Sequence, residues 1–238
     1  MRTIICETYE EMSKKAAEFI RAKITLRPDA VLGLATGSTP LGMYKELIRM
    51  HREEGLDFSK VTTFNLDEYY PIQKTCDQSY DYFMHHNLWD HVNLRPEAVH
   101  IPDGQTADPE AEGQRYDDML RAAGGADIQV LGIGENGHIG FNEPDSALVA
   151  GTHKTALTES TLCANARFFA RKEDMPTHAI TMGMASILSA KTILLLISGE
   201  KKRAAFRALT DGAITPMVPA TFLKLHGDVV ILCTKDVL

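Results

Sequence analysis

A histidine and a carboxylate lie close together in a glycine-rich turn near the middle of the chain. Residues 127–144 read DIQVLGIGENGHIGFNEP, and their apolar start is typical of a buried strand that runs into a polar turn. His138 can move protons near neutral pH, while Glu143 could fix the tautomer of its ring and stabilise the charged form. Asn136 and Asn142 add polar groups around them. A purely structural histidine is the alternative, but this polar surrounding favours a role in proton transfer.

Further carboxylates follow a second apolar segment, residues 61–66. Asn65, Asp67 and Glu68 lie at its end, where a strand can hold a general base in a fixed direction and shift its pKa. Asp67 could also cap the next segment or pair with a surface cation. From this stretch alone, that structural role is the simpler interpretation.

A turn of small residues connects an expected strand, residues 30–35, to an expected helix, residues 41–52. It comprises Thr36, Gly37, Ser38 and Thr39. Backbone amides and hydroxyls at a helix N-terminus suit one phosphate group. The same residues could merely cap the helix, with Thr39 as N-cap and Pro40 in the first turn, and both interpretations remain open. No GK[ST] follows, which disfavours a nucleoside triphosphate.

Two basic residues could hold a phosphate group from the other side. Arg167 in ANARFF has the planar guanidinium that suits phosphate oxygens, and Lys202 in GEKKR falls in the first turn after an apolar segment. Most basic side chains are simply solvated, so neither residue carries much weight alone. Lys201 and Arg203 compete with Lys202 for this role.

Several other functions are disfavoured by the pattern. Residues 132–137 formally match GxGxxG, but Pro144 interrupts the next turn and no acidic residue lies between Asp145 and Glu159, so nicotinamide binding is not expected. No HExxH is present, and the four cysteines are widely spread without a CxxC pair. We therefore expect reduced thiols and no metal site.

Apolar segments typical of strands alternate with amphipathic segments typical of helices. The expected strands are residues 3–6, 30–35, 61–66, 99–101, 128–133, 179–182, 192–198 and 229–233, and the expected helices are residues 9–22, 41–52, 79–91, 108–123, 157–169, 185–190 and 200–209. This order predicts an α/β fold with an open, mostly parallel, Rossmann-like sheet and helices on both faces. We expect one domain, residues 1–238.

Composition and charge narrow the class of protein. The chain has 44% hydrophobic and 24% charged residues and a net charge of −7, which gives no electrostatic reason to expect nucleic acid or a membrane surface as partner. Its N-terminus lacks the apolar stretch of a signal peptide, and no segment is long and apolar enough to span a membrane. A cytoplasmic protein is the simplest expectation.

Together these motifs resemble the glucosamine-6-phosphate deaminase family, also called glucosamine-6-phosphate isomerases. The resemblance runs through LGLATGSTPLGMY, TTFNLDEYY, LGIGENGHIGFNEP, ANARFF and the helix after LLLISG, and so covers nearly the whole chain. It implies conversion of D-glucosamine 6-phosphate and water to D-fructose 6-phosphate and ammonia, without a cofactor. The partner would be this small substrate, bound by a monomer or small homo-oligomer.

The resemblance also implies roles for individual residues. His138 would assist ring opening, and Asp67 would take a proton from C2 and return it at C1. Glu143 and Asn136 would orient and tune His138. The phosphate would be held by Thr36, Gly37, Ser38, Thr39, Arg167 and Lys202, and residues 145–169 would form a lid near the active site.

The chain departs from the family pattern in two places. Some members have Asp where this chain has Asn136, which implies a changed pH profile and not a lost activity. The chain also stops at Leu238, without the C-terminal extension of the allosteric hexameric members, so allostery is not expected. A 6-phosphogluconolactonase is the enzymatic alternative, disfavoured by Glu143 after Asn142. A sugar-phosphate sensor without catalysis is the alternative from another class.

Overall fold

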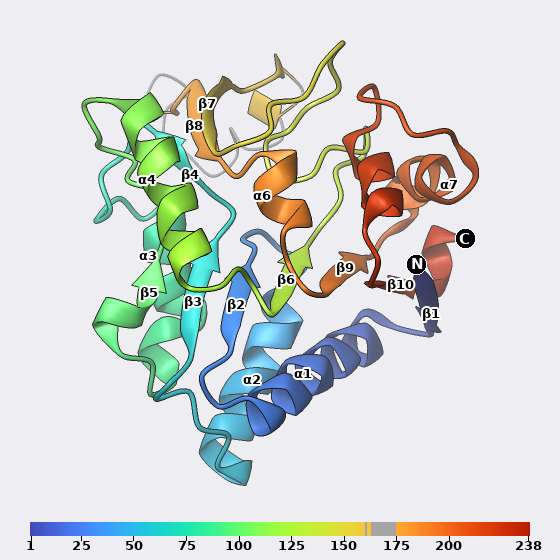
Figure 1. The fold of residues 1–238 in the computed structure, drawn as a ribbon. Coiled ribbons are helices and arrows are strands. Elements are labelled where there is room, and N and C mark those ends of the chain that lie inside the picture. Colours follow the sequence, from blue (N-terminus) through green and yellow to red (C-terminus); the bar gives the residue numbers. More distant parts are fainter. Residues whose placement is uncertain (160, 163–174) are drawn as a thin grey trace.

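The computed structural model describes residues 1–159, 161–162 and 175–238. Its largest element is a seven-stranded sheet in the order β1-β10-β9-β6-β2-β3-β5, in which every neighbouring pair is parallel (Figure 1). The strands are β1 (Arg2–Cys6), β2 (Val31–Leu34), β3 (Thr62–Asn65), β5 (Val99–His100), β6 (Ile128–Leu131), β9 (Ile193–Ile197) and β10 (Val229–Thr234). The open, mostly parallel sheet is thus confirmed.

Helices cover both faces of this sheet, as the sequence predicts. One face packs against α1 (Tyr9–Leu26), α2 (Leu41–Glu54) and α3 (Tyr80–Asn87), and the other against α4 (Pro109–Ala122), α6 (Met184–Leu188) and α7 (Arg203–Asp211). Along β10, Val230 and Leu232 belong to the first core and Val229 and Ile231 to the second. Strands buried on both faces explain why these segments are continuously apolar.

Short 3-10 helices connect several of these elements. They are η1 (Trp89–His91), η2 (Pro96–Ala98), η5 (Glu200–Lys202), η6 (Pro219–Leu225) and η7 (Lys235–Val237). The expected single helix over residues 79–91 is wrong, because α3 ends at Asn87 and Leu88 adopts a non-helical conformation. The expected helix over residues 157–169 lies mostly outside the described residues.

A second, smaller sheet was not predicted. β4 (Asp67–Tyr70), β8 (His178–Thr181) and β7 (His153–Ala156) pair antiparallel in the order β4-β8-β7. The strands expected from the sequence include none at β4 or β7. Tyr69, Ala179 and Phe141 share a separate apolar cluster around this sheet. The sheet therefore has its own small core.

Thr39 does not cap α2, so that part of the sequence interpretation is wrong. The N-cap is Pro40, and no side chain of the cap residue bonds to the helix. The hydroxyl of Tyr9, in α1, instead accepts a hydrogen bond from the Gly42 N–H at 2.8 Å. A side chain from another helix thus satisfies a donor that local capping would otherwise serve.

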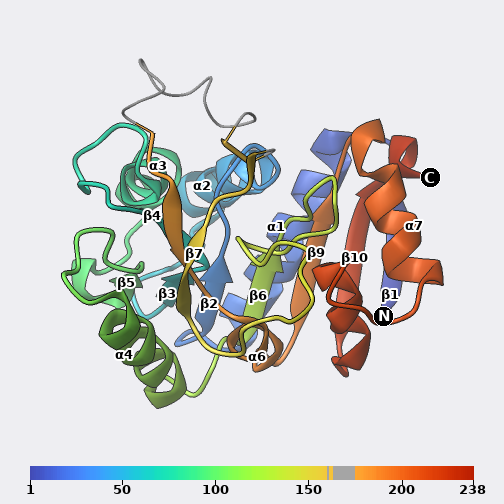
Figure 2. The ribbon, with the colours of Figure 1, turned by 90° about the horizontal axis from the view of Figure 1, so that it is seen from above.

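The direction in which the chain crosses the main sheet changes between β2 and β6. From β2 the chain moves to β3 and β5, whereas from β6 it moves to β9 and β10 on the other side (Figure 2). Loops after strands on either side of such a point diverge and leave a crevice at the carboxyl ends. The turns after β2 and β6 are the two glycine-containing turns singled out in the sequence.

At the opposite end of these two strands, the buried carboxylate of Asp127 joins them. It accepts the Val31 N–H at 2.9 Å, Arg27 Nη1 at 2.8 Å and Lys191 Nζ at 2.8 Å. Burial would raise the pKa of Asp127, but these three partners together hold it below its usual value. The start of β2 is therefore fixed to the start of β6.

Asp127→Ala should lower the free energy of unfolding by about 3 kcal/mol, because it leaves a buried N–H unpaired and removes two charge-assisted hydrogen bonds. Urea unfolding measures this loss. The matched control is Asp29→Ala, since Asp29 is exposed and lies 3.4 Å from the same Arg27. It should change stability by less than about 0.5 kcal/mol. Equal effects of the two variants would contradict the role of Asp127.

Candidate active site

A cavity of about 410 Å³ lies at the carboxyl ends of β2 and β6. Its walls come from the turn after β2, the start of β4, the first turn of α3, the glycine-rich turn after β6, and η5. Lining residues include Thr36, Gly37, Ser38, Thr39, Asp67, Tyr80, Asn136, His138, Thr161 and Lys202. Of the ten site residues expected from the sequence, eight line this one cavity.

The turn after β2 has a backbone that suits an anion. Gly37 has a φ of +91°, which favours glycine, and no heavy atom of the described residues lies within 4 Å of the place where a Cβ would stand. These residues therefore leave space beside its backbone. The Tyr9 hydroxyl lies 2.9 Å from the Ser38 carbonyl oxygen and 3.0 Å from that of Thr39, so α1 holds the turn in place. The N-terminus of α2 follows directly.

Lys202 reaches the same cavity from η5, which follows β9. Burial lowers the pKa of its ammonium, and the nearby charge of Glu135 partly opposes that shift. Within the described parts of the chain, its Nζ has no ion-pair partner. Lys201 is exposed, and Arg203 makes ion-pair and backbone contacts with Glu200 and Asp236. Lys202 is thus the basic residue of GEKKR that lines the cavity, whereas Arg167 lies outside the described residues.

Asp67 enters the cavity from the first position of β4 and is only 5% exposed. Its Oδ2 lies close to the backbone of Gly140, 3.3 Å from the place where a Cβ would stand. Burial, and then the charge of Glu68, raise the pKa of Asp67 to about 8. No hydrogen bond to its carboxylate comes from the described residues. Such a carboxyl group can both take and return a proton near neutral pH.

Glu68, also considered as a base in the sequence, does not line the cavity, and neither does Asn65. Alternation along β4 points Glu68 away from Asp67, and its carboxylate accepts the backbone N–H groups of Tyr69, Tyr80 and Asp81 at 2.8, 2.8 and 2.9 Å. Glu68 thereby caps the start of α3 and fixes Tyr80 at the cavity wall. Asn65 is fully buried in β3.

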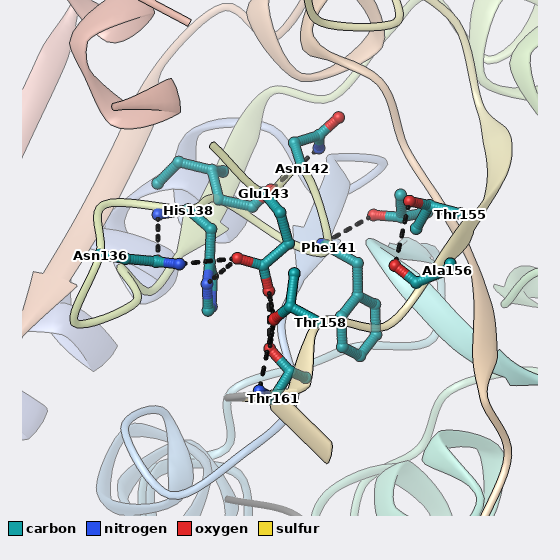
Figure 3. A network of polar contacts seen from close by, with 11 residues as sticks. Asn136, His138, Phe141, Asn142, Glu143, Thr155, Ala156, Thr158 and Thr161 are labelled. Carbon is teal, nitrogen blue, oxygen red and sulfur yellow. Dashed lines mark hydrogen bonds and ion pairs between the residues drawn. The ribbon is translucent and has the colours of Figure 1, made fainter. Parts of the chain in front are cut away.

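Asn136, His138 and Glu143 form one hydrogen-bonded group in the turn after β6 (Figure 3). Glu143 Oε2 lies 3.2 Å from His138 Nδ1 and accepts Asn136 Nδ2 at 2.8 Å, while Asn136 Oδ1 accepts the His138 N–H at 3.1 Å. A carboxylate beside Nδ1 favours a proton on that nitrogen, which leaves Nε2 as the acceptor. The sequence-based pairing of His138 with Glu143 is therefore present in the structure.

Gly134 is needed for the position of the histidine ring. A Cβ at Gly134 would stand 2.4 Å from both Cε1 and Nδ1 of His138. The imidazole therefore lies against the backbone of the turn, where only glycine leaves room. A hydrogen bond from the Gly134 N–H to the His138 carbonyl, at 2.9 Å, closes the same turn.

Thr158 and Thr161 complete the surroundings of Glu143 and were not identified in the sequence. Their hydroxyls donate to Glu143 Oε1 at 3.2 and 2.6 Å. Burial alone would raise the pKa of Glu143, but the hydrogen bond and charge of His138, with hydrogen bonds from Thr161 and Asn136, lower it to about 2. In the sequence, Thr158 and Thr161 are three positions apart at the start of an expected helix, which places them on one face of it. No local pattern connected that face to Glu143.

Two aromatic side chains give the cavity an apolar wall, and these too were missed. The rings of Tyr80 and Phe141 are parallel within 1°, with centroids 6.1 Å apart. Phe141 follows the glycine-rich turn directly, so its neighbours could have suggested this position.

No metal site is found in the part of the chain that the structure describes. Residues 1–159, 161–162 and 175–238 contain no cluster of three or more His, Cys, Asp or Glu side chains that could hold an ion.

Comparison with known proteins places this arrangement in a family. The model of the glucosamine-6-phosphate isomerases/6-phosphogluconolactonase family matches residues 6–231. A glucosamine-6-phosphate deaminase of Clostridioides difficile strain 630 is 53% identical over 98% of this chain and 93% of its own length. One from Halothermothrix orenii is 52% identical, over 99% of this chain and 98% of its own.

Solved structures agree with these sequence matches. A monomeric glucosamine-6-phosphate deaminase superposes with a TM-score of 0.97 at 46% identity and covers 100% of this chain and 98% of its own. A 6-phosphogluconolactonase from Thermotoga maritima, 19% identical over 98% of both chains with a TM-score of 0.75, shares the fold. The chain therefore belongs to the glucosamine-6-phosphate isomerase/6-phosphogluconolactonase family, and within it to the glucosamine-6-phosphate deaminases.

Proposed function

We propose that this protein converts D-glucosamine 6-phosphate and water to D-fructose 6-phosphate and ammonia. The observation that carries the proposal is the meeting of three groups at one cavity: the buried carboxyl of Asp67, His138 with its partner Glu143, and an anion-suited turn together with Lys202. Close relatives bear the name of this activity. A monomer or small homo-oligomer acting in the cytoplasm fits the proposal, since the similar solved deaminase is monomeric.

The phosphate end of the substrate fixes its position. Backbone amides of Gly37 and Ser38, hydroxyls of Thr36 and Thr39, and the ammonium of Lys202 would hold its oxygens. Arg167 is proposed as a further phosphate ligand from the sequence motif alone. A firm grip on a group remote from the reaction orients the sugar carbons toward the catalytic side chains.

His138 opens the sugar ring in this proposal. With Nδ1 facing Glu143, Nε2 is free to accept the proton of the anomeric hydroxyl and then to deliver one to the ring oxygen as the C1–O5 bond breaks. Glu143 stays ionised because of its lowered pKa and stabilises the positive charge that His138 carries between these two events. Asn136 holds the same carboxylate oxygen and the backbone of His138.

Asp67 then moves a proton from C2 to C1 in the open-chain sugar. Removal of the C2 proton gives an enolamine, and its return at C1 leaves an imine at C2. Water adds to that carbon and ammonia leaves, which gives fructose 6-phosphate. The buried position of Asp67 suits this shuttle, because a pKa of about 8 lets the group both take and return the proton.

The first experiment tests the activity itself. Purified protein is given glucosamine 6-phosphate, and ammonia and fructose 6-phosphate are measured, with 6-phosphogluconolactone hydrolysis assayed in parallel. We expect equal amounts of the two products and no lactone hydrolysis. Hydrolysis of the lactone alone would show a lactonase, and binding of glucosamine 6-phosphate without turnover would show a sensor.

Asp67→Asn should lower kcat by two or more orders of magnitude with a KM changed less than about 3-fold, because the variant lacks the base but keeps the shape of the cavity. The wild-type kcat/KM should rise with pH up to about pH 8, since Asp67 must lose its proton to act as a base. The residual activity of the variant should lack this rise. Near-normal turnover in Asp67→Asn would remove the residue from this role.

Lys202→Met should raise the KM for glucosamine 6-phosphate about 10-fold or more, because it removes a charge that faces the substrate phosphate. The neighbouring exposed residue supplies the control. Lys201→Met changes the same charge one residue away and should leave KM within about 2-fold. Steady-state kinetics on both variants measures the difference, and an equal rise in KM would mean that only overall charge matters.

A further inference from the structure

The two oxygens of Glu143 have separate sets of partners. Oε2 faces the catalytic turn and is bonded to Asn136 and His138, as described above. Oε1 faces the other way, toward the hydroxyls of Thr158 and Thr161 (Figure 3). The shortest of these four contacts is the one from Thr161, at 2.6 Å, whereas the contact with His138 is the joint longest, at 3.2 Å. Thr161 therefore makes the closest anchoring contact with the carboxylate.

A glutamate needs such an anchor because its terminal torsion is broad. Without donors on both oxygens, the carboxylate plane can rotate about the last bond of the side chain, and the oxygen that faces Nδ1 moves with it. The side chain of Glu143 is 9% exposed, so little water is available to replace a lost donor. A hydroxyl on Oε1 thus controls the geometry on Oε2.

Thr161 is itself held in place by the segment before it. Its N–H donates to Thr158 Oγ1 at 3.4 Å, so Thr158 contacts Thr161 as well as Glu143. The Leu157 N–H donates to the Thr177 carbonyl at 2.9 Å, and the Leu157 side chain packs in the cluster of the smaller sheet. That sheet also contains Asp67, so one scaffold fixes both the base and the support of Glu143.

We propose that Thr161 is a positioning residue for the reaction: its hydroxyl, through the hydrogen bond to Glu143 Oε1, aims the other carboxylate oxygen at His138 Nδ1. Thr158 is a weaker second support, because its contact with Glu143 is longer. Thr161 also lines the cavity, so the support lies directly beside the substrate. This inference rests on the proposed function for its effect on kcat, whereas the contact between Thr161 and Glu143 can be tested without it.

Thr161→Val replaces the hydroxyl by a methyl group of similar size. It should lower kcat on the order of 10-fold with KM changed less than about 3-fold, because ring opening loses its oriented carboxylate while the phosphate contacts remain. Thr161→Ser keeps the donor and should stay within about 2-fold of the wild type. The matched control is Thr155→Val, the same change at a residue whose hydroxyl contacts, among the described residues, only the Ala156 carbonyl, at 3.5 Å.

A second readout does not depend on activity. In protein labelled with ¹³C at glutamate side chains, the Glu143 signal is identified by its absence in Glu143→Gln. In the wild type this signal should not shift above about pH 4, since the pKa of Glu143 is held well below that point. Loss of a hydrogen bond to the charged form should raise the pKa, so in Thr161→Val the signal should begin to shift at a higher pH than in the wild type.

These readouts separate the two proposals. A wild-type protein that releases no ammonia would refute the proposed function, while the ¹³C titration would still test the contact between Thr161 and Glu143. Wild-type kcat in Thr161→Val would overturn the positioning role, and so would an equal loss in Thr161→Ser. An unmoved Glu143 titration in Thr161→Val would overturn the hydrogen bond on which that role depends.

Discussion

β2 and β6 pair through Leu32 with Ile128 and Gly33 with Gln129, and their ladder ends there. A Cβ at Gly33 would stand 2.0 Å from Oε1 of the buried Gln129, so the Gln129 side chain can pack against β2 here only because position 33 is glycine. Beyond that contact each strand continues into its own turn. The phosphate-suited turn and the histidine turn are thus held at a fixed spacing by the centre of the sheet, and the cavity is the space between them.

Opposite environments give the carboxylates of Asp67 and Glu143 different tasks. Asp67 has no donor among the described residues and a raised pKa, whereas Glu143 has four donors and a lowered one. A carboxyl group that exchanges its proton easily suits a shuttle between two carbons, and one that stays charged suits support of an imidazolium. The difference arises from hydrogen bonds and from the charges of Glu68 and His138, since both groups are largely buried.

The parts of the fold that depend on local pattern could be predicted from the sequence. Continuous apolar segments gave the parallel strands, and the turns after them gave Gly37, His138 and their neighbours, which the family resemblance then joined into one site. Within the β4-β8-β7 sheet, only the strand at β8 was expected. β7 escaped because it alternates exposed with half-exposed positions and so lacks an apolar face, and β4 escaped because it begins only two positions after the last residue of β3. Strand alternation directs the side chains of Asp67 and Glu68 to opposite sides of β4, and the sequence did not reveal that these residues lie in a strand.

Contacts between distant segments could not be predicted either, because no local pattern connects the residues that make them. The capping role expected of Thr39 is filled by Tyr9, 33 positions from the Gly42 N–H that it accepts. Thr161 and Glu143 are 18 positions apart, with no periodic pattern to connect them. The predictions of a lid and of a phosphate contact from Arg167 stay predictions, as does that of a single domain over residues 1–238.

The bond between Asp127 and the Val31 N–H joins residues 96 positions apart, and this has a consequence for folding. Closing so long a loop costs entropy before the pairing repays it, and parallel sheets built from such contacts form slowly. The helices and both turns are local and can form earlier. A partly folded chain would therefore contain every sequence motif of the site without the cavity, and the ability to bind ligand would arise only with the late, long-range step of folding.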